Sequence, residues 1–437
     1  MPDSVALAGA AADSGRLDAN TGVIVFLAFA AAYFISALMR AITATLSPVL
    51  TQDFSLHARD LGLLAGGYFL GFAATQLPLG SWLDRHGPKR VILWFLSLAV
   101  LGCLAFSLAS SFAWLLAARV LVGMGVSACL MAPLTGYRRW FEASTVLRAN
   151  SWMLMTGSLG MLASTLPVQW LMPLTGWRLL FWILAAMILL AMLAIAKVAP
   201  SWKNVASAPG MGMPPRPPAL GASEMAATLP QEASYALVWR SRYFRKMAPL
   251  AFFNYGGMVA MQTLWAGPWM VKVTGNSLLE AATGLFYINA AMLATFWSWG
   301  MVNPGLAQRG WHATRLIGWG VPLSLAVLAF NIQAGSATGW LGWALFCVSS
   351  SAMGLAQPAV GMAFPASLAG RALSAYNLVI FAGVFVTQWG IGLLIDAFLA
   401  MGLTPVAGFQ AAMGVFLCCC IASYAYFLSM KADNSQQ

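Results

Sequence analysis

The stretch Gly80-Ser81-Trp82-Leu83-Asp84-Arg85-His86-Gly87-Pro88-Lys89-Arg90 is a short charged turn between two long apolar runs. The run before it, 61–79, and the run after it, 91–109, each contain about nineteen residues and no formal charge. A helix of that length spans a bilayer core of about 30 Å. The stretch therefore predicts a polar turn between two membrane-spanning helices.

The composition indicates a membrane protein. The chain has 437 residues, of which 60% are hydrophobic and only 8% are charged, whereas about a quarter of the residues of a soluble protein are charged. The formal net charge of +11 would favour nucleic acid if the bases shared one soluble face, but they lie in short segments between apolar runs. We therefore expect a polytopic protein that contacts membrane lipids and binds no nucleic acid.

The sequence lacks the residue patterns of enzymes. The six cysteines lie inside apolar segments without metal-site spacing, which favours packing over disulfides. The three histidines, His57, His86 and His312, show no metal spacing either, and there is no Gly-Lys-Ser/Thr nucleotide loop and no plausible triad. The sequence thus predicts no enzyme, no metal and no cofactor, and it argues against a pump driven by ATP.

Twelve apolar spans fall into two groups of six, which predicts an all-α fold. We expect the first six-helix bundle at 21–198 and the second at 247–430, joined by a proline-rich linker at 199–246. Short polar tails are expected at 1–20, where the chain looks disordered, and at 431–437. The expected spans lie at about 21–48, 61–79, 91–109, 112–133, 149–171, a sixth ending near 197, 247–271, 281–302, 313–333, 339–362, 374–398 and 409–430.

The opening turn fits the pattern G-x-x-L-D-R-x-G-x-K-R. This pattern resembles the loop between the second and third helices of the major facilitator superfamily, a large group of secondary transporters, and 361–396 resembles the tenth-to-eleventh helix region of bacterial members. The resemblance covers 21–430 and implies two six-helix pseudo-repeats, a substrate site between them and transport by alternating access. The matching positions of the turn are Gly80, Asp84, Arg85, Gly87, Lys89 and Arg90.

The distribution of bases predicts the orientation. Placing both termini in the cytoplasm puts eighteen of the twenty-three bases inside and leaves only Arg59, Arg178 and Lys272 outside. Cytoplasmic loops are enriched in Lys and Arg. We therefore expect a multi-pass protein of the bacterial inner membrane, and the resemblance implies a monomer.

The resemblance also implies a cytoplasmic gate. In the superfamily the acid of the turn, here Asp84, caps or pairs with the cytoplasmic end of the eleventh helix, near Ser374, with Arg371 as a candidate partner. Gly80 and Gly87 are expected to permit close helix approach and a tight turn. The counterpart at 303–311 has Gln308 in place of the acid, so we expect the gate mainly on the N-terminal half.

Two arginines remain inside the spans, and no acid lies near the midplane. Arg40 of the first span, with Tyr33 on the same helical face, favours an anionic substrate, because guanidinium matches a carboxylate or phosphate. Its position is similar to that in the anion:cation symporter branch; the alternative is pairing with Asp53 or lipid phosphate. Arg119 matches the fourth-helix pattern R-x-x-x-G-x-G, which leaves a structural, coupling or substrate role open.

The coupling mechanism stays open. The anion:cation branch carries acids where this chain has Met39 and Val126, so proton symport by that route is not supported and a counter-substrate is an alternative. The fifth span lacks the G-P-x-x-G-G pattern of drug/proton antiporters, because Met161 follows Gly160. Proton-coupled efflux of drugs or metabolites is the alternative function, and a sensor that no longer transports is a third.

Neutral polar residues complete the predicted substrate site. Helical spacing places Asn254 and Gln262 on one face of the seventh span, with Tyr255 beside them, and Asn377 and Gln388 on one face of the eleventh. Amides in spanning helices also join neighbouring helices. The sequence therefore leaves two roles open for them, helix packing and contact with a small molecule that we expect to be anionic.

Overall fold

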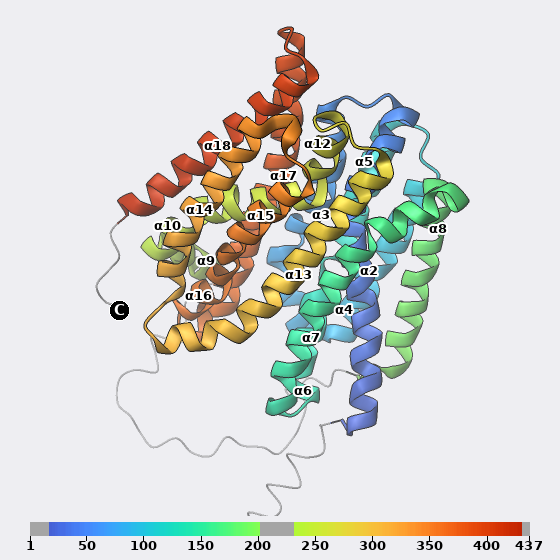
Figure 1. The fold of residues 1–437 in the computed structure, drawn as a ribbon. Coiled ribbons are helices and arrows are strands. Elements are labelled where there is room, and N and C mark those ends of the chain that lie inside the picture. The colour runs from blue at the N-terminus through green and yellow to red at the C-terminus, as the bar shows by residue number, and fades with distance from the viewer. Residues whose placement is uncertain (1–16, 202–230, 431–437) are drawn as a thin grey trace, which may run out of the picture.

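The computed structural model describes residues 17–201 and 231–430, which form helices and no strands (Figure 1). The N-terminal half contains α2 (Ala19–Phe54), α3 (Ala58–Ala74), α4 (Gln76–Ser107), α5 (Phe112–Val126), α6 (Ala128–Trp140), α7 (Ala143–Ala163) and α8 (Leu166–Val198). The C-terminal half contains α9 (Gln231–Arg240), α10 (Arg242–Leu250), η2 (Ala251–Tyr255), α11 (Gly256–Ala260), η3 (Met261–Trp265), α12 (Ala266–Lys272), α13 (Leu278–Gln308), α14 (Ala313–Ala334), η4 (Gly335–Ala337), α15 (Trp340–Ser350), η5 (Ser351–Leu355), α16 (Ala356–Met362), α17 (Ala366–Ala400) and α18 (Pro405–Ser429).

The predicted twelve spans are confirmed. Within the described ranges, nine helices are long and apolar enough to cross a membrane. The other three spans are segmented: α3 continues into the start of α4, α7 continues into the start of α8, and α10 to α12 follow one another without a loop. Helix α9 and the first turn of α10 lie in the expected linker region, whose residues 202–230 are outside the described ranges, as are most of the two expected tails.

Two glycines make the sharp turns inside α4 and α8. Gly87 has φ 76° and ψ 160° and is buried, and Gly176 has φ 60° and ψ 173°. This backbone region is open essentially to glycine alone. The tight turn expected at Gly87 is therefore present, whereas a Cβ at Gly80 would meet nothing within 4 Å, so Gly80 is at no close helix contact.

The second helix of each half begins with the same kind of cap. His57 and Asp60 form a capping box at the start of α3. At the start of α13, Ser277 N donates to Glu280 Oε2 over 2.8 Å, and Glu280 N donates to Ser277 Oγ over 3.3 Å. Such reciprocal bonds satisfy backbone N–H groups that a helix leaves free. The pair is a local sign of the repeat between the halves.

Successive spans alternate in direction, so the bundle has two ends. We call the end with the α4 turn the Gly87 end, and the end where α17 finishes the Asp396 end; the latter is at the top of Figure 1. The halves pack tightly where α3 meets α17: a Cβ at Gly62 would lie 2.3 Å from the Gln388 carbonyl oxygen, and one at Gly392 would lie 2.4 Å from that of Ala58. Such close backbone approach requires small residues, and these contacts lie toward the Asp396 end.

Candidate functional site

Arg40 lies between the two halves near the middle of α2. Its guanidinium carbon is 5.7 Å from the centre of the Phe72 ring, and Tyr33, Tyr68 and Tyr255 lie close enough to interact with its charge. The residue is partly exposed, and its Nε is buried without a hydrogen-bond partner in the described part of the chain. The four ion pairs found among the described residues do not include it.

Asp53, the alternative partner considered for Arg40, has other contacts. It accepts a hydrogen bond from Trp177 Nε1 over 2.7 Å and lies 3.9 Å from Arg178 Nη1. Both of those residues belong to α8, at the Asp396 end. Asp53 therefore joins two helices of the N-terminal half and leaves Arg40 without a carboxylate.

Aromatic residues of both halves flank Arg40. The ring centres of Phe72 and Phe381 are 4.5 Å apart, which joins α3 to α17. On another side, the Tyr255 ring lies against Gly354, where a Cβ would be 4.0 Å from its Cε2 atom. Tyr255 is in the π-helical segment η2 and Gly354 in the 3₁₀ segment η5, and such irregular turns inside helices are frequent at functional sites.

An amide pair completes the arrangement in the C-terminal half. Gln357 Nε2 of α16 donates to Asn377 Oδ1 of α17 over 2.8 Å. Asn377 is one helical turn before Phe381, and Gln357 is one turn after Gly354. We call the following set the inter-half ring: Arg40, Phe72, Tyr255, Gly354, Gln357, Asn377 and Phe381.

The described chain does not fully cover the inter-half ring. All its members except Phe72 are partly exposed, although the ring joins helices of both halves. The N-terminal half contributes a cation, and the C-terminal half contributes neutral amides and aromatic rings. A ligand bound at the ring would meet one positive charge, aromatic rings and neutral amides.

Arg119 lies one layer away, inside the N-terminal half. It is 1% exposed, its Nη2 donates to Thr43 Oγ1 over 2.6 Å, and its guanidinium carbon is 5.0 Å from the Tyr68 ring centre. Tyr68 in turn donates to the Ser36 carbonyl over 3.2 Å. Tyr68 also lies beside Arg40, so it connects the two arginines.

Three of the predicted amides join helices of the C-terminal half. Asn254 Nδ2 donates to Ser423 Oγ over 2.7 Å, Gln262 Nε2 to Asn289 Oδ1 over 3.0 Å, and Gln388 Nε2 to Thr263 Oγ1 over 2.9 Å. All three are buried. Of the predicted substrate residues, Arg40, Tyr255 and Asn377 come together in the ring and Tyr33 adjoins Arg40. The other four members of the ring, Phe72, Gly354, Gln357 and Phe381, were absent from the predicted set.

Asp396 closes one end of the junction between the halves. Its carboxylate accepts hydrogen bonds from the backbone N–H of Ala58 over 3.1 Å and of Arg59 over 3.0 Å, at the first turn of α3. The Arg59 Nε is 3.9 Å away. A carboxylate at a helix N-terminus is favoured by the free N–H groups and by the helix dipole. We call this contact the Asp396 cap.

The turn at the opposite end shows no such contact. Asp84 is exposed and has no hydrogen-bond or ion-pair partner among the residues with described positions, and α17 begins after Pro365 without a side-chain cap. Lys89 Nζ donates to the Ala199 carbonyl at the end of α8 over 2.8 Å, and Arg371 lies near Tyr235 of α9. Arg85 and Arg90 are exposed. The contact of Asp84 with α17 stays a prediction.

The sequence profile of the Major Facilitator Superfamily matches residues 29–388. The chain belongs to this superfamily. It is therefore a multi-pass membrane transporter, as the resemblance of the Asp84 turn predicted. The superfamily identifies the mechanism class and leaves the transported molecule open.

Curated relatives within the superfamily carry a drug-resistance name. The multidrug resistance protein MdtL of Escherichia coli O45:K1 (strain S88 / ExPEC) is 25% identical over 380 residues, which cover 83% of this chain and 92% of that protein. The MdtL of Shigella flexneri serotype 5b (strain 8401) is 24% identical over the same shares.

Solved structures of the superfamily share the fold. A bacterial homologue of the human lysosomal transporter Spinster matches with a TM-score of 0.74 at 18% identity, covering 96% of this chain and all of that one. A D-xylose-proton symporter matches with a TM-score of 0.73 at 13% identity, covering 95% and 99%. Identities this low support the fold alone.

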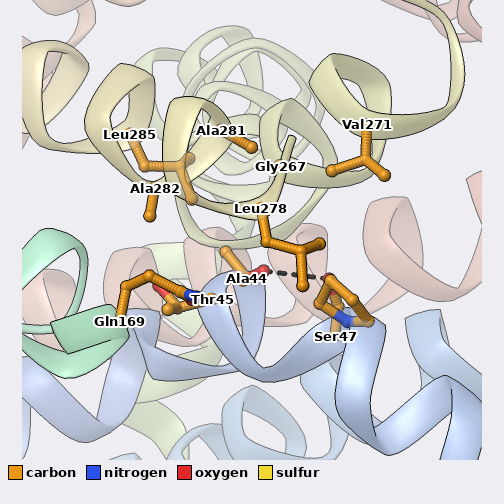
Figure 2. Close-up of a pocket in the computed structure, with 11 residues that line it drawn as sticks. Ala44, Thr45, Ser47, Gln169, Gly267, Val271, Leu278, Ala281, Ala282 and Leu285 are labelled. Carbon is orange, nitrogen blue, oxygen red and sulfur yellow. Dashed lines mark hydrogen bonds between the residues drawn. The ribbon is translucent and has the colours of Figure 1, made fainter. Parts of the chain in front are cut away.

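A pocket lies between the halves, nearer the Asp396 end than the ring. Figure 2 shows it between α2, α8, α12 and α13. The residues that line it include Ala44, Thr45, Gln169, Gly267 and Leu285, and none of the lining residues is charged. Its lining offers no charged group to a substrate, so the inter-half ring is the better candidate for the substrate site of this transporter.

Proposed function

We propose that this transporter moves a small organic anion across the bacterial inner membrane by alternating access, with Arg40 binding the substrate carboxylate. The observation that carries the proposal is the position of Arg40: partly exposed at the junction of the halves, with Nε unpartnered in the described chain. A guanidinium inside a membrane protein is costly unless it meets a counter-charge. A carboxylate fits its two-pronged geometry.

The acids support an anion over a cation. The aspartates and glutamates whose side chains the structure describes lie near helix ends or in turns, and none of them belongs to the inter-half ring. A cationic substrate would share the ring with Arg40 and find no negative charge there. An anion would instead supply the counter-charge that the ring lacks.

We propose that the Gly87 end faces the cytoplasm. The described bases gather at that end, in agreement with the enrichment of Lys and Arg in cytoplasmic loops. The Asp396 cap and the close contacts of α3 with α17 then lie on the outer side. In this assignment the structure is closed to the outside.

We propose that transport of the anion is driven either by exchange for a second anion or by the concentration gradient of the substrate itself. Met39 and Val126 occupy the positions where the anion:cation branch carries acids, and both are buried apolar residues. A side chain without a titratable group cannot take up a proton. Transport that needs no proton gradient is the expected result.

The test uses the full-length protein with Arg40→Met and Lys272→Gln as a matched pair. Each variant removes one positive charge, from the ring and from an exposed position at the Asp396 end respectively. Thermal unfolding in detergent is measured with benzoate, sugar acids, amino acids, phosphorylated sugars and hydrophobic cations, because ligand binding raises stability. We expect stabilisation by carboxylates that disappears in Arg40→Met and persists in Lys272→Gln. Carboxylate binding that survives in Arg40→Met would contradict the proposal.

Drug efflux is the second candidate, and the 25% identical MdtL relative favours it. The aromatic rings of Phe72, Tyr255 and Phe381 could also hold an apolar compound. The same screen separates the two functions. Stabilisation by hydrophobic cations alone would support efflux and rule out the carboxylate site.

A further inference from the structure

The amide pair Gln357–Asn377 offers hydrogen bonds that the described chain does not use. Gln357 Nε2 and Asn377 Oδ1 bond to each other over 2.8 Å. The other amide atoms, Gln357 Oε1 and Asn377 Nδ2, have no partner among the described residues and are not among the buried polar atoms. The pair therefore presents one free acceptor and one free donor side by side.

Two rows of residues connect this pair to Arg40 across the junction of the halves. One row runs from Arg40 to Phe72, then to Phe381 at a ring distance of 4.5 Å, and then one helical turn to Asn377. The other row runs from Arg40 to Tyr255, then to Gly354 and one turn further to Gln357. The two rows end on the same amide pair. The pair and Arg40 therefore lie at opposite sides of one ring, in different halves of the protein.

We propose that the Gln357–Asn377 pair recognises an uncharged hydrogen-bonding group at the far end of the anion. The inference rests on the proposed function, because Arg40 must hold the carboxylate. The preferred substrate is then a monocarboxylate with a flat apolar body between the rings and a hydroxyl or carboxamide at its other end.

The chemistry of the pair sets this preference. A hydroxyl both donates and accepts, so it matches the free Oε1 and Nδ2 atoms. A ligand with a hydrogen atom in place of the hydroxyl leaves the Oε1 and Nδ2 atoms without partners. The loss of one net hydrogen bond lowers the affinity about tenfold. A second carboxylate would lie against neutral amides and aromatic side chains, because no member of the inter-half ring on that side is basic. Moving a charge out of water without a counter-charge is unfavourable.

The experiment compares three probes of one shape on the full-length protein: benzoate, 4-hydroxybenzoate and benzene-1,4-dicarboxylate. Dissociation constants are measured by isothermal titration in detergent. We expect 4-hydroxybenzoate to bind about tenfold more tightly than benzoate, and the dicarboxylate to bind more weakly than both.

Variants then locate the preference. Gln357→Met and Asn377→Leu should remove the preference, so that each variant binds 4-hydroxybenzoate no more tightly than it binds benzoate. Gln410→Met is the control, because Gln410 is a partly buried glutamine with a hydrogen bond to the Ile332 carbonyl, away from the ring. The ranking of the probes by the unmodified protein tests the inference even if a variant fails to fold.

The outcomes separate this inference from the proposed function. Equal binding of benzoate and 4-hydroxybenzoate, lost in Arg40→Met, would overturn the role of the amide pair and keep the anion site. A preference for 4-hydroxybenzoate that persists in both amide variants would also overturn it. If no carboxylate of the wider screen binds, the proposed function fails and the inference fails with it.

Discussion

At the scale of single residues, Gly87 shows how one position shapes the Asp84 turn. Its φ of 76° and ψ of 160° lie in a region that side chains rarely adopt. We expect Gly87→Ala to destabilise the protein by about 1–3 kcal/mol, because the new Cβ strains the turn between the second and third spans. Thermal unfolding in detergent should show a lowered midpoint.

Gly80→Ala is the matched control for that prediction. Gly80 lies in the same motif and inside α4, but a Cβ there would meet nothing within 4 Å. Alanine is also the better helix former by about 1 kcal/mol. An unfolding midpoint that falls equally in both variants would show that the effect does not come from the Gly87 backbone.

The residues of the site were predictable to different degrees. Arg40 stands out in the sequence because a charge inside an apolar span is rare. The amides Asn254, Gln262 and Gln388 also stand out as polar residues in apolar spans, but in the structure they form hydrogen bonds to neighbouring helices. Helical spacing shows which residues share a face and does not show which helix that face meets. Gln357 is the only amide residue of its span, so spacing along the chain does not relate it to Asn377; the fold does.

At the scale of helices, the Asp396 cap joins α17 of one half to α3 of the other. We expect Asp396→Asn to weaken this contact by about 1–2 kcal/mol, because the charge that favours the α3 N-terminus is lost. The population should shift toward a state open at the Asp396 end. Spin labels at Ser111 and Met401, exposed residues at that end of different halves, should report longer distances.

Asp53→Asn is the control for the cap. Asp53 lies near the same end, but its partners Trp177 and Arg178 belong to its own half. Both variants are made with the exposed Cys418 replaced by alanine, so that the label reacts at the chosen sites. Unchanged distances in Asp396→Asn would mean that the cap does not hold this end closed.

Asp84 and α17 are expected to form the reciprocal contact in the other state. Asp84 is exposed without a partner in the described chain, and the α17 N-terminus has no side-chain cap. We predict that Asp84→Asn raises the population open at the Gly87 end, since the opposite state loses its carboxylate.

Labels at Ser201 and Arg309, exposed at the Gly87 end of different halves, measure that shift, with Glu142→Gln as the control at the same end. Full transport together with an unchanged distance distribution would remove the gating role of Asp84.

The helices themselves were largely predictable because apolar length reports membrane crossing directly. The irregular segments η2, η3 and η5 were not, because their wider or tighter turns depend on packing against neighbouring helices. Two of them carry Tyr255 and Gly354. The part of the site that the sequence did not show is thus the part placed by irregular helix geometry.

At the scale of the whole molecule, the two halves divide the work of the proposed site. The N-terminal half supplies the charge of Arg40, and the C-terminal half supplies Tyr255, Phe381 and the amide pair. A ligand that touches both sides must lose one set of contacts when the halves separate at either end. A site divided between two bundles is the arrangement that the proposed alternating access requires.

The orientation decides how every gate is interpreted. Lys272→Cys and Arg309→Cys each place a thiol at an exposed position, at the Asp396 end and the Gly87 end respectively. Because the bases gather at the Gly87 end, we expect a membrane-impermeant maleimide to label Lys272→Cys in intact cells and Arg309→Cys only after permeabilisation. The reverse result would put the Asp396 cap on the cytoplasmic side. The structure would then be closed to the cytoplasm, and the roles argued for Asp84 and Asp396 would exchange.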